Sequence, residues 1–459
     1  MRLAAGLAAV LAFALQARAE NLSERLARRL DKAVRDSSQR TESEFRELLA
    51  SGLHPGSPLA AIRKSITWDS CREGVEFLAS DALLGRDTGS DGHRAAAEWA
   101  AKRFESFGLK PVGDDGGWFQ NWKWARRKTM NVVALLEGET DEVVVVGAHL
   151  DHVGHGDPGI FSGRIPNPLA GEDRIYNGAD DNASGSDALV HIAQALAALG
   201  KKPRRGVLFI LFSGEEKGLL GSSHYLANPI VPLEKTVAML NFDMVGRNKD
   251  RECAVLGAQC SPELGRAVLR ANRGIGMKLE VPTDSTPTIF MQSDQFTFYQ
   301  KRIPCLFFTT GGHTEYHTAL DHADRINVGK IEDIAELGAL LALGVAEDRQ
   351  RPTWLPISGL GPKLGVTPQP LAGAQLQALG LKENEGGVRL ASLMDNFPAK
   401  NAGLQVGDIV IAFDGKPLPR ENTLEAFRKA ITKVKAGGSQ EVTVIRNTKR
   451  LTVTVQYEK

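Results

Sequence analysis

Acidic and imidazole side chains stand directly after several apolar segments of this chain. His149 and Asp151 follow the run VVVVGA, the adjacent pair Glu215 and Glu216 follows VLFILFSG, and Asp243 follows VAMLNF. Zinc accepts histidine and carboxylate side chains together, because this borderline metal takes both nitrogen and oxygen donors. The pattern therefore predicts a metal centre assembled from the ends of strands.

Two more residues of the same kind lie in loops. His317 comes just beyond the apolar run CLFFTT, and Asp181 lies within NGADDNASG, ahead of a helix expected to begin near Ser186. Each acid alone could cap a helix, and each histidine could be an ordinary surface residue. Together they favour one shared site, because the carboxyl ends of strands in an open α/β sheet line a single crevice.

The elements that must position these residues alternate along the chain from Thr67 onward. Short apolar runs rich in valine and phenylalanine are typical of buried strands, and they recur as MNVVALLEG, DEVVVVGAHLD, GVLFILF, TVAMLNFD and IPCLFFTTG. Segments of helical length separate them, such as SGSDALVHIAQALAALG, whose apolar residues repeat on one helical face. This alternation predicts an α/β fold with a mostly parallel central sheet flanked by helices.

Shifts in composition divide the chain further. A basic Arg2, a short apolar run and the small residues Ala17 and Ala19 are typical of a secretory signal, and the run is shorter than the about 20 residues that span a membrane. Export to the periplasm or the medium is therefore expected, without stable membrane insertion. The expected segments are a signal peptide at 1–19, a helical N-terminal arm at 20–66, the α/β domain at 67–346, a linker at 347–356 and a small β-rich domain at 357–459.

The net charge and the cysteines bear on possible partners and on disulfide bonds. A formal net charge of +1 offers no broad basic surface, so nucleic acid is not an expected partner. Export would place the four cysteines in an oxidising setting, where Cys253 and Cys260 could pair across a short loop. Cys305, within the apolar run IPCLFF, is instead expected to be a buried free thiol.

The α/β segment resembles the secreted aminopeptidases with a co-catalytic pair of zinc ions, which are related to glutamate carboxypeptidase and the transferrin receptor. The motifs that carry this resemblance occur in the order GAHLDH, GADDNASG, FSGEEKGLLGS, NFDMVG and HTEYHTALD. The resemblance implies that His149 and Asp243 bind one zinc, that Glu216 and His317 bind the other, and that Asp181 bridges the two. It also implies a cis peptide bond after Asp181.

The same resemblance assigns the remaining polar residues. It implies that Glu215 is the general base, taking a proton from the attacking water and passing it to the leaving amine. It implies that Asp151 orients the His149 imidazole and that Tyr316 hydrogen-bonds the developing oxyanion. Four further histidines match no ligand position and are expected to line the pocket or lie at the surface: His152, His155, His313 and His322.

The C-terminal segment has a different signature. The stretch GGVRLASLMDNFPAKNAGLQVGDIVIAFDGKPL resembles the PDZ modules of bacterial exported proteases. Such modules receive a peptide as an added strand and hold its terminal carboxylate in backbone N–H groups, for which Pro362–Val366 is the candidate loop. The domain could therefore bind peptide C-termini, or could only pack against the α/β domain.

The function that these observations favour is hydrolysis of N-terminal residues from peptides with a free N-terminus. A two-metal carboxypeptidase or another amide hydrolase or transferase would use a similar site. A receptor-like binding protein that has lost catalysis would keep the fold, but the presence of all five ligands and Glu215 favours an enzyme.

Overall fold

The computed structural model describes residues 57–159, 162–282, 288–357, 364–371, 373–393, 397–435 and 437–457. These residues form two compact units that divide between Leu355 and Pro356. The predicted signal peptide and most of the predicted N-terminal arm lie outside the described residues. Among the helices that are described, none combines the length and apolar character needed to cross a bilayer.

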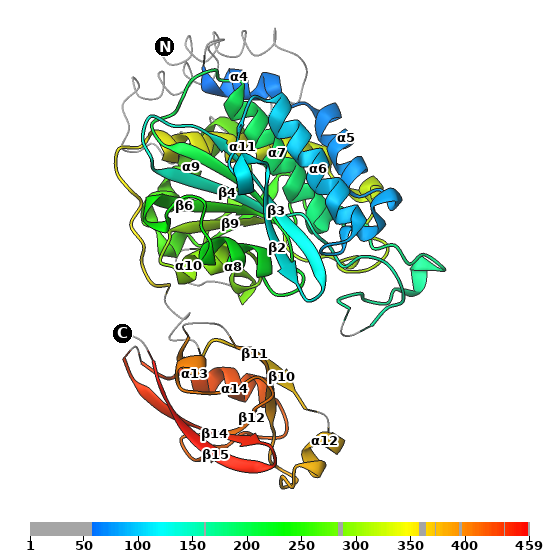
Figure 1. The fold of residues 1–459 in the computed structure, drawn as a ribbon, viewed down its shortest axis with the longest axis vertical. Helices are drawn as coiled ribbons and strands as arrows, with labels where there is room; N and C mark the ends of the chain where they lie inside the picture. Colours follow the sequence, from blue (N-terminus) through cyan, green and yellow to red (C-terminus); the bar gives the residue numbers. More distant parts are fainter. Residues whose placement is uncertain are drawn as a thin grey trace, which may run out of the picture. The chain divides into compact units, whose positions relative to one another are not determined.

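A nine-stranded mixed sheet forms the centre of the first unit (Figure 1). Its strand order is β1-β3-β5-β4-β6-β9-β7-β8, and β2 pairs with β3. The four central strands β5, β4, β6 and β9 are parallel to one another, and antiparallel strands flank them. The bounds are β1 Lys110–Pro111, β2 Phe119–Trp124, β3 Arg127–Leu136, β4 Val143–His149, β5 Gly206–Phe212, β6 Thr236–Phe242, β7 Glu252–Leu256, β8 Lys278–Glu280 and β9 Cys305–Thr309.

Helices cover both faces of this sheet (Figure 1). One face is covered by α4 (Pro58–Ser65), α5 (Trp68–Leu78), α6 (Asp91–Ser106), α7 (Gly185–Ala197), α9 (Pro262–Ile275) and α11 (Val328–Glu347), whose apolar residues share one core with the sheet. The other face is covered by α8 (Leu220–Ala227) and α10 (Gln295–Gln300). The predicted α/β fold is thus confirmed, with four parallel strands at the centre of a mixed sheet.

Strand β5 illustrates why its sequence is apolar throughout. Successive side chains of a strand point to opposite faces, so a strand covered on both faces needs apolar residues at every position. Phe209 packs against Phe104 of α6 with ring centroids 6.2 Å apart, whereas Phe212 packs against Phe298 of α10 at 6.1 Å. The continuous run GVLFILF is the consequence.

The second unit is an antiparallel sheet with short helices. Its strand order is β10-β11-β12-β14-β15, and β13 pairs with β12. Phe427 of α14 packs edge-on against Phe413 of β12, and the buried core includes Val388, Val410 and Val442. The bounds are β10 Val366–Pro370, α12 Gly373–Ala378, β11 Val388–Leu393, α13 Pro398–Asn401, β12 Ile409–Phe413, β13 Lys416–Pro417, α14 Thr423–Thr432, β14 Ser439–Arg446 and β15 Lys449–Gln456.

The four cysteines are all buried and free. The pairing of Cys253 with Cys260 that the sequence allows is therefore not formed. Cys260 lies against Cys305 instead, because its sulfur accepts a hydrogen bond from the Cys305 N–H at 3.3 Å and donates one to the Cys305 carbonyl at 3.3 Å. The expectation that Cys305 is a buried free thiol is confirmed.

Candidate metal centre

The central strands bring the predicted ligands to one edge of the sheet. His149 is the last residue of β4, Asp243 directly follows β6, and Glu216 follows β5 within a short turn. His317 lies in the loop after β9. Since β5, β4, β6 and β9 run parallel to one another, their carboxyl ends lie along the same edge, as the sequence pattern predicted.

Two groups of ligand atoms meet at the carboxylate of Asp181. His149 Nε2 lies 3.1 Å from Asp181 Oδ1 and 3.2 Å from Asp243 Oδ1. His317 Nε2 lies 2.9 Å from Asp181 Oδ2 and 3.1 Å from Glu216 Oε1. Each oxygen of Asp181 therefore faces a different imidazole, which is the arrangement that a bridging carboxylate requires.

The imidazole orientations fit a metal at both positions. Nδ1 of His149 lies 3.1 Å from the Asp151 carbonyl, and Nδ1 of His317 lies 2.9 Å from the Gly163 carbonyl. Because a carbonyl only accepts, both Nδ1 atoms donate, and in the neutral imidazole each Nε2 lone pair then faces carboxylate oxygens. An Nε2 lone pair can lie about 3 Å from a carboxylate oxygen only with a proton or a metal cation between the two atoms. Ligands of tetrahedral zinc lie roughly 3.3 Å apart, within a few tenths of these separations.

The backbone of the loop that carries Asp181 is hydrogen-bonded to a second carboxylate. Asp321 accepts hydrogen bonds from the backbone N–H groups of Asp180 and Asp181, at 3.0 and 3.1 Å. The expected cis peptide bond is present between Asp181 and Asn182. Ala183 and Ser184 follow, and α7 begins at Gly185, so the bridging carboxylate is fixed at the entrance to a buried helix.

Glu215 stands beside this centre without joining either group. Its backbone N–H donates to Asp151 Oδ1 at 3.2 Å. Burial raises the pKa of Glu215 well above its ordinary value, and although His149 opposes this shift, the neighbouring carboxylates Glu216 and Asp243 add to it. A buried carboxyl group with a raised pKa beside a set of potential metal ligands is suited to general acid–base chemistry.

Asp151 supports both His149 and Glu215. Its backbone carbonyl accepts from His149 Nδ1, whereas its carboxylate lies 4.0 Å from that atom. The carboxylate instead accepts from Thr88 Oγ1 at 2.7 Å and from the Glu215 backbone. Asp151 therefore contacts the His149 imidazole through its main chain, and its carboxylate holds Thr88 and the Glu215 backbone.

One histidine that matched no ligand position joins the centre. His152 Nδ1 lies 2.8 Å from Glu216 Oε1 and 3.7 Å from Asp181 Oδ2, and its side chain is fully buried. Atoms of His152, Asp181, Glu216 and His317 all lie within 4.8 Å of one another, so this half of the centre offers four side chains. The available signal was the position of this second histidine in GAHLDH, three residues after His149.

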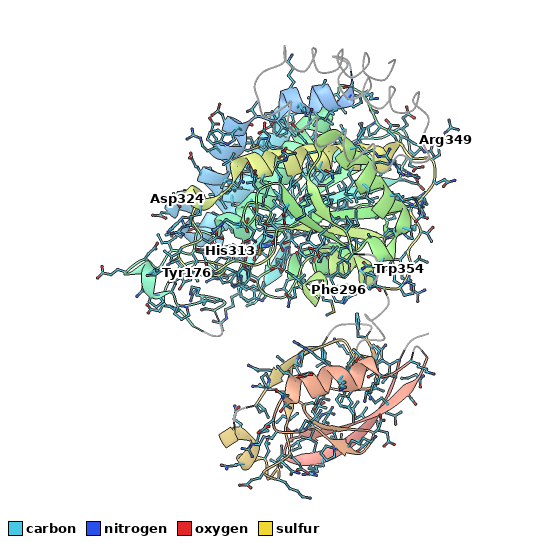
Figure 2. All side chains as sticks on the ribbon, turned by 180° about the vertical axis from the view of Figure 1, so that it is seen from behind. Tyr176, Phe296, His313, Asp324, Arg349 and Trp354 are labelled. Carbon is cyan, nitrogen blue, oxygen red and sulfur yellow. The ribbon has the colours of Figure 1, made fainter. Side chains whose placement is uncertain are left out.

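The other three histidines lie outside both groups. His313, labelled in Figure 2, places Nε2 3.3 Å from Asp180 Oδ2 and so supports the bridging loop. His322 Nε2 lies 3.3 Å from Asp173 Oδ2, and His155 is exposed. His155 thus lies at the surface, as one of the two expected alternatives, whereas His313 is nearly buried against the loop of Asp181.

The loop between His149 and Asp181 reaches the second half of the centre. The Gly163 carbonyl accepts from His317 Nδ1, and the N–H of Ile165 donates to the His317 carbonyl at 2.7 Å. Tyr176, labelled in Figure 2, is buried with Val153 and Ala319 in a small apolar cluster. The loop therefore fixes the His317 segment, which has a positive φ of 57° at the histidine itself.

Tyr316 lies beside His317 and is partly exposed. Its ring stacks on His317 with centroids 4.0 Å apart, and 37% of the residue surface remains exposed. Burial and the carboxylates of Asp181 and Glu216 raise its pKa, so the phenol keeps its proton over the physiological range. The hydroxyl is available as a hydrogen-bond donor.

Comparisons with known proteins find a match for each of the two units. Residues 131–342 match the model of peptidase family M28, and residues 362–457 match the PDZ domain model. A probable leucine aminopeptidase 1 of Trichophyton verrucosum is 35% identical over 144 residues, which cover 30% of this chain and 33% of that protein. An aminopeptidase of Pseudomonas aeruginosa is 40% identical over 124 residues, covering 26% and 19%.

The chain thus matches about a third or less of the length of these two relatives. The solved structure of the Legionella pneumophila LapA aminopeptidase aligns with 64% of this chain and 75% of its own, at 20% identity and a TM-score of 0.49. The two family matches fall on the two compact units. The first unit therefore contains a domain of peptidase family M28, and the second is a PDZ domain.

Proposed function

We propose that this protein is an exported metallo-aminopeptidase that removes N-terminal residues from peptides at a two-zinc centre. The observation that carries the proposal is the division of the Asp181 carboxylate between two imidazole–carboxylate groups. His149 and Asp243 would hold one ion. Glu216 and His317 would hold the other, with His152 beside them. The aminopeptidase names of the relatives and the family match support the same reaction class.

The residues of the chain divide the work of hydrolysis. When bound, the ions would supply Lewis acidity and would make water a better nucleophile near neutral pH. Glu215 takes a proton from the attacking water and returns it to the leaving amine. Asp151 fixes both His149 and the Glu215 backbone, so that ligand and base keep their relative positions. Tyr316 donates a hydrogen bond to the oxygen of the scissile carbonyl as negative charge develops there.

The proposal is tested with purified protein and paired substrates. Aminoacyl nitroanilides with a free amine should be cleaved, whereas the same amides with a blocked amine should not. A chelator should abolish the activity, and added zinc should restore it. Cleavage of N-blocked peptides from the C-terminus would instead identify a carboxypeptidase, and a protein that binds zinc but cleaves neither substrate would be receptor-like.

Export is a separate part of the proposal. Its basis is the sequence of the first 19 residues, which has the charge, apolar run and small residues of a secretory signal. Expression of the full chain in a bacterial host should give a mature protein that begins near Glu20. A protein that stays in the cytoplasm with Met1 intact would contradict this part without affecting the catalytic one.

Peptide C-termini are the proposed ligand of the PDZ domain. Strand β10 pairs only with β11 in the described part of this unit, so its other edge can accept a strand. Pro362 and Lys363 of the candidate carboxylate loop lie outside the described residues, whereas Leu364 and Gly365 are buried. Amidation of the C-terminus should raise KM for long peptides, because it removes the terminal carboxylate that the PDZ domain would hold. Equal KM values for free and amidated long peptides would argue against this binding.

A further inference from the structure

A second cluster of metal-ligand side chains lies within the helical layer of the M28 domain, apart from the centre described above. Cys71 comes from α5, and Asp187 and His191 stand one turn apart on α7. One potential ligand atom of each lies within 4.8 Å of the others. All three residues are buried, with at most 1% of their surface exposed.

Asp187 is the residue that calls for an explanation. Neither of its carboxylate oxygens has a hydrogen-bond partner in the described part of the chain, although the residue is fully buried. A Cβ added to Gly74 would lie 1.8 Å from Asp187 Oδ1, so the carboxylate occupies space that only a glycine leaves open. Burying an ionised carboxylate without a partner is costly, so such a group either takes up a proton or lies against a cation.

The orientation of His191 leaves a lone pair for such a cation. Its Nδ1 lies 3.1 Å from Gln194 Oε1, which accepts, so Nδ1 carries the hydrogen. Metal-bound histidines almost always donate their other ring N–H in this way. Nε2 then faces Asp187 Oδ1 at 3.4 Å. That separation is longer than the about 2.7–2.9 Å of a charge-assisted hydrogen bond, and close to the roughly 3.3 Å between two ligands of tetrahedral zinc.

Charge and ligand type point to the same metal. A thiolate from Cys71, a carboxylate from Asp187 and a neutral imidazole from His191 together balance the two charges of Zn²⁺, so the complex would be neutral inside the core. Thiolate and imidazole donors select zinc over magnesium and calcium.

We propose that Cys71, Asp187 and His191 form a structural zinc site that ties α5 to α7. Because α7 begins just after the loop that carries Asp181, the site would also stabilise the helix behind the catalytic centre. This proposal does not depend on the proposed function, since none of its ligands belongs to the rim of the sheet. The alternative occupant is a proton shared between Asp187 and His191 as a buried ion pair.

Cobalt distinguishes these two occupants. Full-length protein reconstituted with Co²⁺ should show thiolate-to-cobalt charge transfer in the near ultraviolet, which histidine and carboxylate ligands of the catalytic centre cannot produce. Cys71→Ser should abolish this absorption and lower the bound metal by one equivalent. Cys253→Ser is the matched control, because Cys253 is also buried in this unit but belongs to none of the potential ligand groups found among the described residues.

The wild-type spectrum is decisive even if Cys71→Ser fails to fold. Absence of the charge-transfer band in cobalt-loaded wild-type protein would overturn the site in favour of the ion pair. Loss of the band in both cysteine variants would also overturn it. His191→Gln should weaken the charge-transfer band and leave the metal ions of the catalytic centre bound. Failure of the catalytic proposal would change the activity but not this band.

Discussion

The two halves of the candidate metal centre share one carboxylate but differ in how they are built. The first half, His149 with Asp243, is buried and comes directly from the ends of two neighbouring strands. In the second half, Glu216 follows β5 by a short turn, and His317 and His152 come from loops; the His317 side chain is 12% exposed. Strand ends fix ligands through the sheet, whereas loops need added support, which here comes from Gly163 and Ile165. Loop-built ligands can also adapt to substrate.

The largest expected effect follows from changing Asp181, the carboxylate that the two halves share. Asp181→Asn keeps the size of the side chain but removes its charge, so both metal equivalents of the catalytic centre should bind more weakly. Activity should fall by more than the roughly hundredfold loss expected on removing a general base. Metal content and nitroanilide turnover check this together. If only one equivalent were lost, Asp181 would not bridge.

Removing the base should separate chemistry from metal binding. Glu215→Gln should lower kcat by about a hundredfold or more and leave both metal equivalents bound. Glu139→Gln, at an exposed position, is the control that should retain full activity. Near-normal turnover in Glu215→Gln would exclude Glu215 as the base, and loss of metal would place it among the ligands instead.

Changing His152 tests whether this residue contributes to metal binding in the second half, as a ligand or as a support for one. His152→Ala should weaken the binding of one metal equivalent by about tenfold to a hundredfold, as expected for a group that supports or supplies a ligand. The other equivalent, held by His149 and Asp243, should be unaffected. Titration of the metal-free protein with zinc measures the affinity of each equivalent. His155→Ala, at an exposed position, is the control. Unchanged affinities would make the two halves equivalent in ligand number.

Tyr316 should give the smallest effect. Tyr316→Phe removes the hydroxyl but keeps the ring that stacks on His317. Because 37% of the residue is exposed, water can replace the lost donor, and kcat should fall by about tenfold rather than the 10²–10³ typical of an enclosed oxyanion donor. KM should change little. A larger rise in KM than fall in kcat would indicate a role in substrate binding instead.

The strand-end ligands were predictable from sequence because their elements are strongly patterned. Apolar runs buried on both faces identify β4, β5 and β6, and a polar residue that ends such a run must emerge at the carboxyl edge of the sheet. His149, Glu216 and Asp243 were therefore found together. The family resemblance supplied the bridging role of Asp181 and the cis peptide bond, which no local pattern would have indicated.

Three other features could not be predicted, because they depend on contacts between segments that are distant in the sequence. His152 was set aside because nothing in its spacing shows that its imidazole turns toward Glu216. Cys260 was assigned a neighbour close in sequence, yet it packs on Cys305 from β9. Cys71 and Asp187 come together only because α5 packs on α7 against a glycine.

The sequence by itself determined which residues end buried strands, because the alternation and burial of side chains are set locally by backbone geometry. It also determined, through composition, that the C-terminal unit is separate. Only the tertiary structure decided which oxygen of Asp181 faces which histidine, and which histidine joins the centre. Those choices depend on how loops from different strands pack, and packing is a property of the whole core rather than of any one segment.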